Sequence, residues 1–169
     1  KRLCKQHNVD DERFPPKQLA YFIAHCKEEG MRPGDVPTHD SDARKKVEIY
    51  QLYEEQCQRE GVVDFGELML RSYELLRDND PIREHYQRRF QHMLVDEFQD
   101  TNKLQYAWLK QLAGNEVGGR FEARGSVIAV GDDDQSIYAF RGARVGNMAD
   151  FVREFDVQHQ IQLAQNYRS

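Results

Sequence analysis

Two short apolar segments that each end in a cluster of acids constrain the fold of this chain most strongly. Residues 93–95 (MLV) run directly into 96–100 (DEFQD), and residues 126–130 (SVIAV) run into 131–134 (GDDD). Short apolar runs bounded by polar residues are typical of buried strands. In an open α/β sheet, ligands bind outside the carboxyl ends of the strands. The sequence therefore predicts a binding site where these acids lie.

Asp96 and Glu97 are the first two acids after the earlier strand. Successive side chains along a strand diverge, so one carboxylate can hold a cation while the other faces a separate atom. A metal ligand beside a base is the minimum needed to hydrolyse a nucleoside triphosphate, because Mg²⁺ neutralises the phosphate oxygens and the base orients the attacking water. The alternative is structural: Asp100 or Thr101 caps a helix over residues 102–113, whose dipole favours the other acids.

Three motifs resemble motifs II, III and IV of the superfamily 1 DNA helicases of the UvrD/Rep branch. They are VDEFQD at residues 95–100, VGDDDQSIYAFRGA at 130–143 and QNYRS at 165–169. The motifs are ungapped and follow the family's order, and the segment before them is also similar to this family, so the resemblance covers essentially the whole chain. It implies an α/β fold: part of a RecA-like P-loop NTPase domain, with a parallel sheet and flanking helices, preceded by an all-helical insertion subdomain.

The resemblance implies that these motifs bind and hydrolyse ATP with Mg²⁺. Asp96 would hold the metal ion, and Glu97 would position or deprotonate the attacking water. Gln135 would touch the γ-phosphate region and couple the state of the nucleotide to DNA; alternatively, its amide makes a hydrogen bond at a helix start. Tyr167 would stack on adenine, and Arg168 would reach the γ-phosphate as an arginine finger.

Motif III also carries residues that the resemblance implies as contacts to single-stranded DNA. Tyr138 and Phe140 match positions that stack bases and link them to the nucleotide cleft, and Arg141 follows them. Stacking tolerates any sequence, because every base has a π-face. This suits a motor better than a reader of sequence. The alternative is that either ring is buried beneath its loop.

A further segment, VDFGEL at residues 63–68, resembles a family motif of the form DFxxL near the path of single-stranded DNA. This resemblance implies Asp64 and Phe65 as DNA contacts. The alternative is structural, because Asp64 and Glu67 have the spacing of a capping box at the start of a helix. The residues alone leave both interpretations open.

The chain changes character near residue 91. Up to about residue 90 its pattern is helical, and from His92 it follows strand, helix, strand, helix, strand, which is α/β order. With the resemblance, this predicts a 1B-like helical segment over residues 1–90 that returns to domain 1A near its end. The second half of the RecA-like domain 1A would follow over residues 91–160, and the second RecA-like domain, 2A, would begin over 161–169.

Periodicity and turn residues predict the individual elements. Expected helices cover residues 16–29, 41–59, 64–76, 80–89, 102–113 and 145–155, and expected strands cover 93–95, 126–130 and 160–164. Residues 115–125, which are polar and rich in glycine, are expected to form an exposed loop. Four apolar residues of the helical part are expected in the core, namely Leu19, Phe22, Leu68 and Leu76.

Composition excludes several classes of protein. With 39% apolar and 31% charged residues the chain is of the globular class. It has no apolar run near the length of a bilayer span and no signal-peptide core. We therefore expect a protein that does not bind membranes and that lies in the bacterial cytoplasm, associated with the nucleoid. Because its net charge is −5, any binding of nucleic acid must come from a local groove or stacking surface. The three cysteines are far apart and favour reduced thiols.

The phosphate-binding loop GxxxxGK[ST] is absent from the sequence, as are the glutamine motif before it and motifs V and VI after it. We therefore expect an internal piece, inactive by itself, of an ATP-dependent 3′-to-5′ DNA helicase of repair or replication. Its partners would be single-stranded DNA, junctions of single-stranded and duplex DNA, repair proteins and the rest of the helicase chain. The alternative is a non-catalytic DNA-binding or protein-docking module derived from such a helicase.

Overall fold

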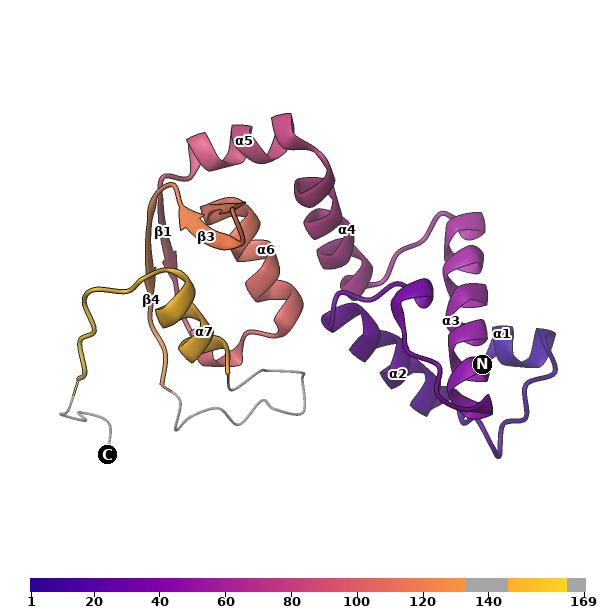
Figure 1. Cartoon of the computed structure of the whole chain (residues 1–169). Helices are drawn as coiled ribbons and strands as arrows, with labels where there is room; N and C mark the ends of the chain where they lie inside the picture. The colour runs from indigo at the N-terminus through magenta and orange to yellow at the C-terminus, as the bar shows by residue number, and fades with distance from the viewer. Residues whose placement is uncertain (133–145, 164–169) are drawn as a thin grey trace.

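The computed structural model describes residues 1–132 and 146–163 (Figure 1). The first part contains α1 (Arg2–Gln6), α2 (Pro16–Glu28), the 3₁₀ turn η1 (Pro33–Asp35), α3 (Ser41–Glu60), α4 (Phe65–Asp78) and α5 (Asp80–Arg89). The second part contains β1 (His92–Val95), η2 (Phe98–Asp100), α6 (Lys103–Ala113), β2 (Gly114–Val117), β3 (Arg120–Ala123), β4 (Ser126–Ala129) and α7 (Asn147–Glu154). The predicted change from helices to mixed helix and strand is confirmed. None of the helices in these two ranges is long and apolar enough to cross a bilayer.

Two clusters of apolar side chains hold α1, α2 and α3 together. The first contains Cys4, Phe14, Leu19 and Ile49, and the second contains Ile23, Cys26 and Tyr50. Tyr50 is fully buried, and its hydroxyl donates to the carbonyl of Met31 at 3.0 Å, so burial of the ring leaves its polar atom satisfied.

The predicted core positions of the helical part are confirmed except for Leu68. Leu19 and Leu76 are buried, and Phe22 is partly buried against the second cluster. Leu68 is exposed, because α4 turns a different face inward. That face carries Glu67 and Leu70, and a helix rotates about 100° per residue, so Leu68 points away from it.

β1 and β4 lie side by side as parallel strands, with His92 opposite Ser126 and Val95 opposite Ala129 (Figure 1). α6 and α7 pack on one face of this pair. The core there contains Phe98, Tyr106, Leu109 and Phe151, packed against Met93, Val95, Val127 and Ala129. α6 also contacts α4, where Trp108 Nε1 donates to Ser72 Oγ at 2.8 Å. α4 in turn contacts α2, so it joins the two parts of the molecule.

The prediction that these strands are buried is correct for one face only. Side chains alternate along a strand, so Met93 and Val95 face the helices while Leu94 points the other way. Leu94 is 71% exposed and Ile128 is 61% exposed, because no described helix covers their face. The third expected strand is not formed over 160–163, the described part of its range, where no described strand lies beside it to share hydrogen bonds.

The prediction of a loop over residues 115–125 is wrong. β2 and β3 form an antiparallel hairpin in which Val117 lies opposite Arg120. The two turn residues, Gly118 and Gly119, have φ values of 59° and 79°. A two-residue hairpin turn with both φ values positive matches the right-handed twist of its strands, and glycine adopts it at no steric cost.

Gln87 of α5 anchors this hairpin. Its buried side chain donates through Nε2 to the carbonyls of Gln111 and Gly114, both at 2.9 Å, and accepts through Oε1 from Arg124 at 3.3 Å. The hairpin is therefore held by groups from α5 and α6 that lie far from its own turn.

The residue that caps the start of α6, just after the acidic motif, also differs from the prediction. Asn102 caps α6, in place of Asp100 or Thr101. Its side chain accepts the N–H of Gln105 at 2.8 Å, and the Gln105 side chain accepts the N–H of Asn102 at 3.0 Å, which forms a capping box. Neither predicted residue caps α6. The Thr101 hydroxyl instead donates to the carbonyl of Phe98 at 2.7 Å, and Asp100 belongs to η2.

Candidate functional site

The carboxyl ends of β1 and β4 lie next to each other, and the acids at which the sequence predicts a binding site follow these ends. The N–H of Val130 donates to the carbonyl of Val95 at 2.8 Å, and the N–H of Phe98 donates to the carbonyl of Val130 at 2.9 Å. These bonds continue the pairing past both strand ends. The two acids after β1, Asp96 and Glu97, therefore lie near the first residues after β4.

A sharp turn at Glu97 separates the acids from the core. Glu97 has φ of 52° and ψ of 41°, a left-handed conformation that costs a non-glycine residue roughly 1–2 kcal/mol. Its N–H donates to Asp96 Oδ1 at 2.9 Å. After the turn Phe98 is fully buried, while Asp96 and Glu97 are exposed. Both carboxylates are thus open to a ligand, and strain of this kind is common at functional sites.

Asp96 is suited to hold Mg²⁺ together with a phosphate group. Mg²⁺ usually keeps several waters and is bound by one or two carboxylates plus substrate phosphates. Among residues 1–132 and 146–163, no group of three or more His, Cys, Asp or Glu side chains is arranged to hold a metal ion by itself. An exposed carboxylate at a strand end fits the shared type of site, and the role of Asp96 as its ligand stays a prediction.

Gln99 belongs to this site although the sequence analysis does not single it out. Its side chain donates through Nε2 to Glu97 Oε2 at 2.6 Å and accepts through Oε1 from the N–H of Asp132 at 3.1 Å. Gln99 is 5% exposed. It therefore connects the acid after β1 with the chain after β4. The local sequence offers no signal for this contact, because Asp132 lies 33 residues away.

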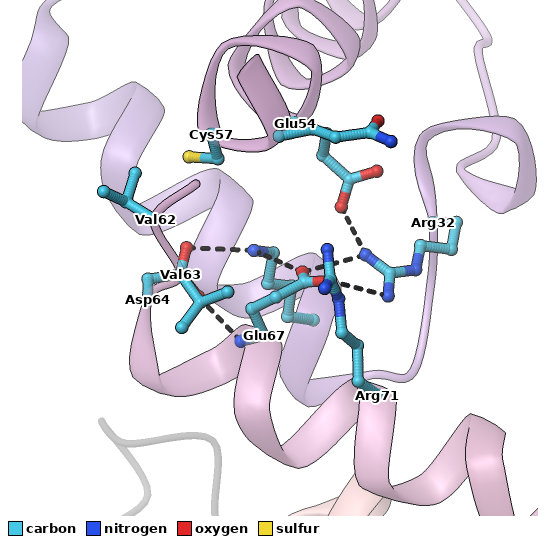
Figure 2. Close-up of a pocket in the computed structure, with 10 residues that line it drawn as sticks. Arg32, Glu54, Cys57, Val62, Val63, Asp64, Glu67 and Arg71 are labelled. Carbon is cyan, nitrogen blue, oxygen red and sulfur yellow. Dashed lines mark hydrogen bonds and ion pairs between the residues drawn. The ribbon is translucent and has the colours of Figure 1, made fainter. Parts of the chain in front are cut away.

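Asp64, in the DFGEL segment, makes its contacts within the protein (Figure 2). Its Oδ1 accepts the N–H of Glu67 at 2.7 Å, and its Oδ2 accepts from Lys27 Nζ and from the Tyr53 hydroxyl, each at 2.9 Å. Burial alone would raise the pKa of Asp64, but these three hydrogen bonds outweigh it and lower the pKa. The capping role of Asp64 is confirmed, and its contact with DNA stays a prediction.

Glu67 does not complete the expected capping box, because its buried carboxylate is the centre of an ion cluster (Figure 2). It accepts from Lys27 Nζ at 2.9 Å, Arg32 Nη1 at 2.8 Å and Arg71 Nε at 2.6 Å. Burial raises the pKa of Glu67, but the hydrogen bonds from Arg32, Lys27 and Arg71 together hold it at about 2, below the ordinary 4.5. The carboxylate therefore stays charged inside the protein.

The ion cluster borders a cavity of about 210 Å³ between α2, α3 and α4 (Figure 2). Its charged lining includes Lys27, Arg32 and Arg71 and the carboxylates Glu54, Asp64 and Glu67. Each of these cations is paired with at least one of these carboxylates. Because its charges are balanced internally, we assign this cavity a structural role and place no ligand in it.

Phe65 differs from its neighbour Asp64, because its ring is 91% exposed. Three other apolar residues close to it in sequence are also exposed, namely Val62, Val63 and Leu68. An exposed ring can stack on a base of single-stranded nucleic acid. Of the two residues implied in the DFGEL segment, the structure leaves Phe65 the more available to a partner, and its role toward DNA stays a prediction.

The remaining predicted site residues lie outside the described residues. They are Gln135, Tyr138, Phe140 and Arg141 of motif III and Tyr167 and Arg168 of motif IV. Their roles toward ATP and DNA stay predictions. Asp132, which immediately precedes the first of these segments, donates its N–H to Gln99.

Comparison with known proteins relates the whole chain to DNA helicases. Residues 1–156 match the family model of the UvrD/REP helicase N-terminal domain. The chain is 50% identical to DNA helicase II of Haemophilus influenzae and 45% identical to DNA helicase II of Escherichia coli, over alignments that cover 100% of this chain and 22% of each relative. It is 39% identical to ATP-dependent DNA helicase UvrD1 of Mycobacterium tuberculosis, over 95% of this chain and 21% of that protein. The chain thus spans about a fifth of the length of these relatives.

Proposed function

Because the chain belongs to the UvrD/REP helicase family, we propose that it is an internal part of an ATP-dependent DNA helicase, spanning motifs II to IV. The intact enzyme would move along single-stranded DNA in the 3′-to-5′ direction and unwind duplexes during repair or replication. The observation that carries this proposal is the parallel pairing of β1 with β4, which places Asp96 and Glu97 at adjoining strand ends. In α/β proteins this is the position of the ligand site.

We propose that residues 91–160 are the second half of a RecA-like ATPase domain and that residues 1–90 are mainly its helical insertion. Residues 161–169 would begin the second RecA-like domain. The support is the family match, the small parallel sheet covered by α6 and α7, and the succession of helices before β1.

The acids after β1 would carry the chemistry. Asp96 would hold Mg²⁺, which when bound neutralises charge on the phosphate oxygens. Glu97 would orient the attacking water and accept its proton, since its carboxylate is exposed and fixed by Gln99 at 2.6 Å. Gln135 and Arg168 would act at the γ-phosphate and Tyr167 at the adenine, while Tyr138, Phe140 and Arg141 would contact DNA.

We expect Phe65→Ala in the intact helicase to weaken binding of single-stranded DNA. A stacked base contributes roughly 1–3 kcal/mol, so the dissociation constant should rise about 5- to 150-fold, for a homopolymer and for a mixed sequence alike. Folding stability should change by less than about 0.5 kcal/mol, because the ring is almost fully exposed. Fluorescence anisotropy with labelled oligonucleotides measures the affinity.

The matched control is Tyr21→Ala, which removes an exposed aromatic ring from α2, outside the DFGEL segment. Its affinity for single-stranded DNA should stay at the wild-type value. If the two variants bind DNA equally well, Phe65 has no role in DNA binding.

We expect the 169-residue chain by itself to show no ATP hydrolysis, with or without single-stranded DNA. Its sequence lacks the GxxxxGK[ST] loop that anchors the phosphates, and positioning with electrostatic stabilisation is nearly all that a protein contributes to phosphoryl transfer. A steady-state ATPase assay tests this. DNA-stimulated turnover that disappears in Glu97→Gln would show that no other segment is needed. The flanking coding sequence gives an independent test, since a P-loop motif upstream supports the enzyme and its absence supports a docking module.

A further inference from the structure

Among the described residues, Gln99 is the only one whose side chain hydrogen-bonds the Glu97 carboxylate. The geometry of Gln99 suits a residue that holds this carboxylate in place. The backbone of Gln99 lies in η2, and its side chain is buried between the ends of the two strands. One end of the amide donates to Glu97 Oε2 at 2.6 Å, and the other accepts the N–H of Asp132 at 3.1 Å. The amide thus spans the gap between the chain after β1 and the chain after β4.

The chemistry of the two partners allows a single orientation of this amide. A carboxylate oxygen can only accept, so it requires the NH₂ end, and a backbone N–H can only donate, so it requires the oxygen end. The reversed orientation would place two acceptors against each other and two donors against each other. Both bonds therefore fix the same rotamer, which makes the side chain a rigid link.

Space for this link depends on Gly131. A Cβ atom built on Gly131 would lie 2.6 Å from Gln99 Oε1 and 3.2 Å from the backbone nitrogen of Gln99. Real Cβ contacts are longer than the first of these, so any side chain at this position would push the amide away. The glycine after β4 is thus part of the same arrangement.

We infer that Gln99 is a positioning residue that holds the carboxylate of Glu97 in the direction of the attacking water. Glu97 needs such support because its side chain is exposed, and among the described residues only Gln99 gives its carboxylate a side-chain hydrogen bond. Displacement of a reacting group by about 1 Å can cost about 100-fold in rate, so a buried anchor for the base has a direct effect on turnover. This inference rests on the proposed role of Glu97 as the base.

The test is a double-mutant cycle in the intact helicase. Gln99→Leu removes both bonds at similar volume and should lower kcat for DNA-stimulated ATP hydrolysis by roughly 10- to 100-fold, the usual effect of losing a supporting contact. KM for ATP should stay within about twofold, because the Gln99 side chain is buried and both ends of its amide are bonded to groups of the protein. In the Glu97→Gln background, Gln99→Leu should cause no further loss of kcat, since a residue that acts through Glu97 has nothing left to position.

The matched control is Gln87→Leu. Gln87 is also a buried glutamine, with two bonds of 2.9 Å to carbonyls, but it anchors the β2–β3 hairpin away from the strand ends. It should lower the melting temperature and leave kcat unchanged. If Gln99→Leu does not fold, Gly131→Ala displaces the same amide from the other side and should give the same loss of kcat in the same cycle.

Two results would overturn the inference: a kcat for Gln99→Leu equal to that of Gln87→Leu, or the same fold loss in the wild-type and Glu97→Gln backgrounds. Failure of the proposed function is distinguishable, because Glu97→Gln would then turn over ATP at nearly the normal rate. That result would also remove the basis for a positioning role.

Discussion

In the intact helicase, we expect Glu97→Gln to lower kcat for ATP hydrolysis by roughly 100-fold or more while Mg²⁺ and ATP still bind. The amide is nearly the size of the carboxylate and can still accept a hydrogen bond, so the site should keep its shape. It cannot take a proton from water, because its basicity is negligible. The expected signature is a loss in kcat with KM little changed, measured by steady-state kinetics with saturating single-stranded DNA.

Glu122→Gln provides the control for this substitution. Glu122 is an exposed glutamate on β3, in the hairpin and away from the strand ends. Glu122→Gln removes one negative charge, as Glu97→Gln does, so any effect of net charge on DNA binding should appear in both variants. Turnover of Glu97→Gln close to that of Glu122→Gln would remove Glu97 from the mechanism.

The second large effect concerns folding. We expect Glu67→Gln to lower the free energy of unfolding of the chain by about 3 kcal/mol. Glu67 accepts hydrogen bonds from Lys27, Arg32 and Arg71, and the Lys27 side chain is 3% exposed. Removing the central negative charge leaves the buried Lys27 and the partly buried Arg32 with fewer partners, which costs more than the loss of an exposed pair. Urea denaturation followed by the fluorescence of Trp108 measures the change. Trp108 of α6 reports on this region because it bonds to Ser72 of α4, the helix that also carries Glu67.

The same stabilisation should depend on pH in a defined direction. The pKa of Glu67 is held at about 2, below its ordinary value of 4.5, so its charged form is favoured in the folded state. A lowered folded-state pKa contributes stability that is fully present above about pH 4.5 and is lost as the pH falls toward 2. The difference in the free energy of unfolding between wild type and Glu67→Gln should therefore be constant near neutral pH and shrink between pH 4.5 and 2.

The control for folding is Glu48→Gln, which removes an exposed partner of Lys45 on α3. Exposed pairs contribute little, so its free energy of unfolding should change by less than about 0.5 kcal/mol. A Glu67→Gln variant no less stable than Glu48→Gln would show that the buried cluster adds nothing to stability.

Much of the local structure follows from the sequence, because its determinants lie within a few residues of each other. The apolar spacing of α2 and the proline at its start predict that helix, and the carboxylate of Asp64 caps α4 as its spacing predicts. The glycine pair at 118–119 is also a local signal for the β2–β3 turn, although the polar composition of the segment outweighs it in the prediction of a loop. The segments that resemble motifs II to IV indicate the family in the same way.

The tertiary structure alone decides which side chains are buried and what they bond. Lys27 meets Asp64 across 37 residues, and Gln99 meets Asp132 across 33 residues. Such partners come together only when packing of α2 on α4, and of α6 and α7 on β1 and β4, brings distant segments into contact. The sequence thus determines the helices, the parallel strands β1 and β4 and the acids that follow them. The fold decides that Glu67 is an ion-cluster centre, that Leu94 is exposed and that Gln99 holds Glu97, because burial and long-range hydrogen bonds depend on neighbours that local sequence does not specify.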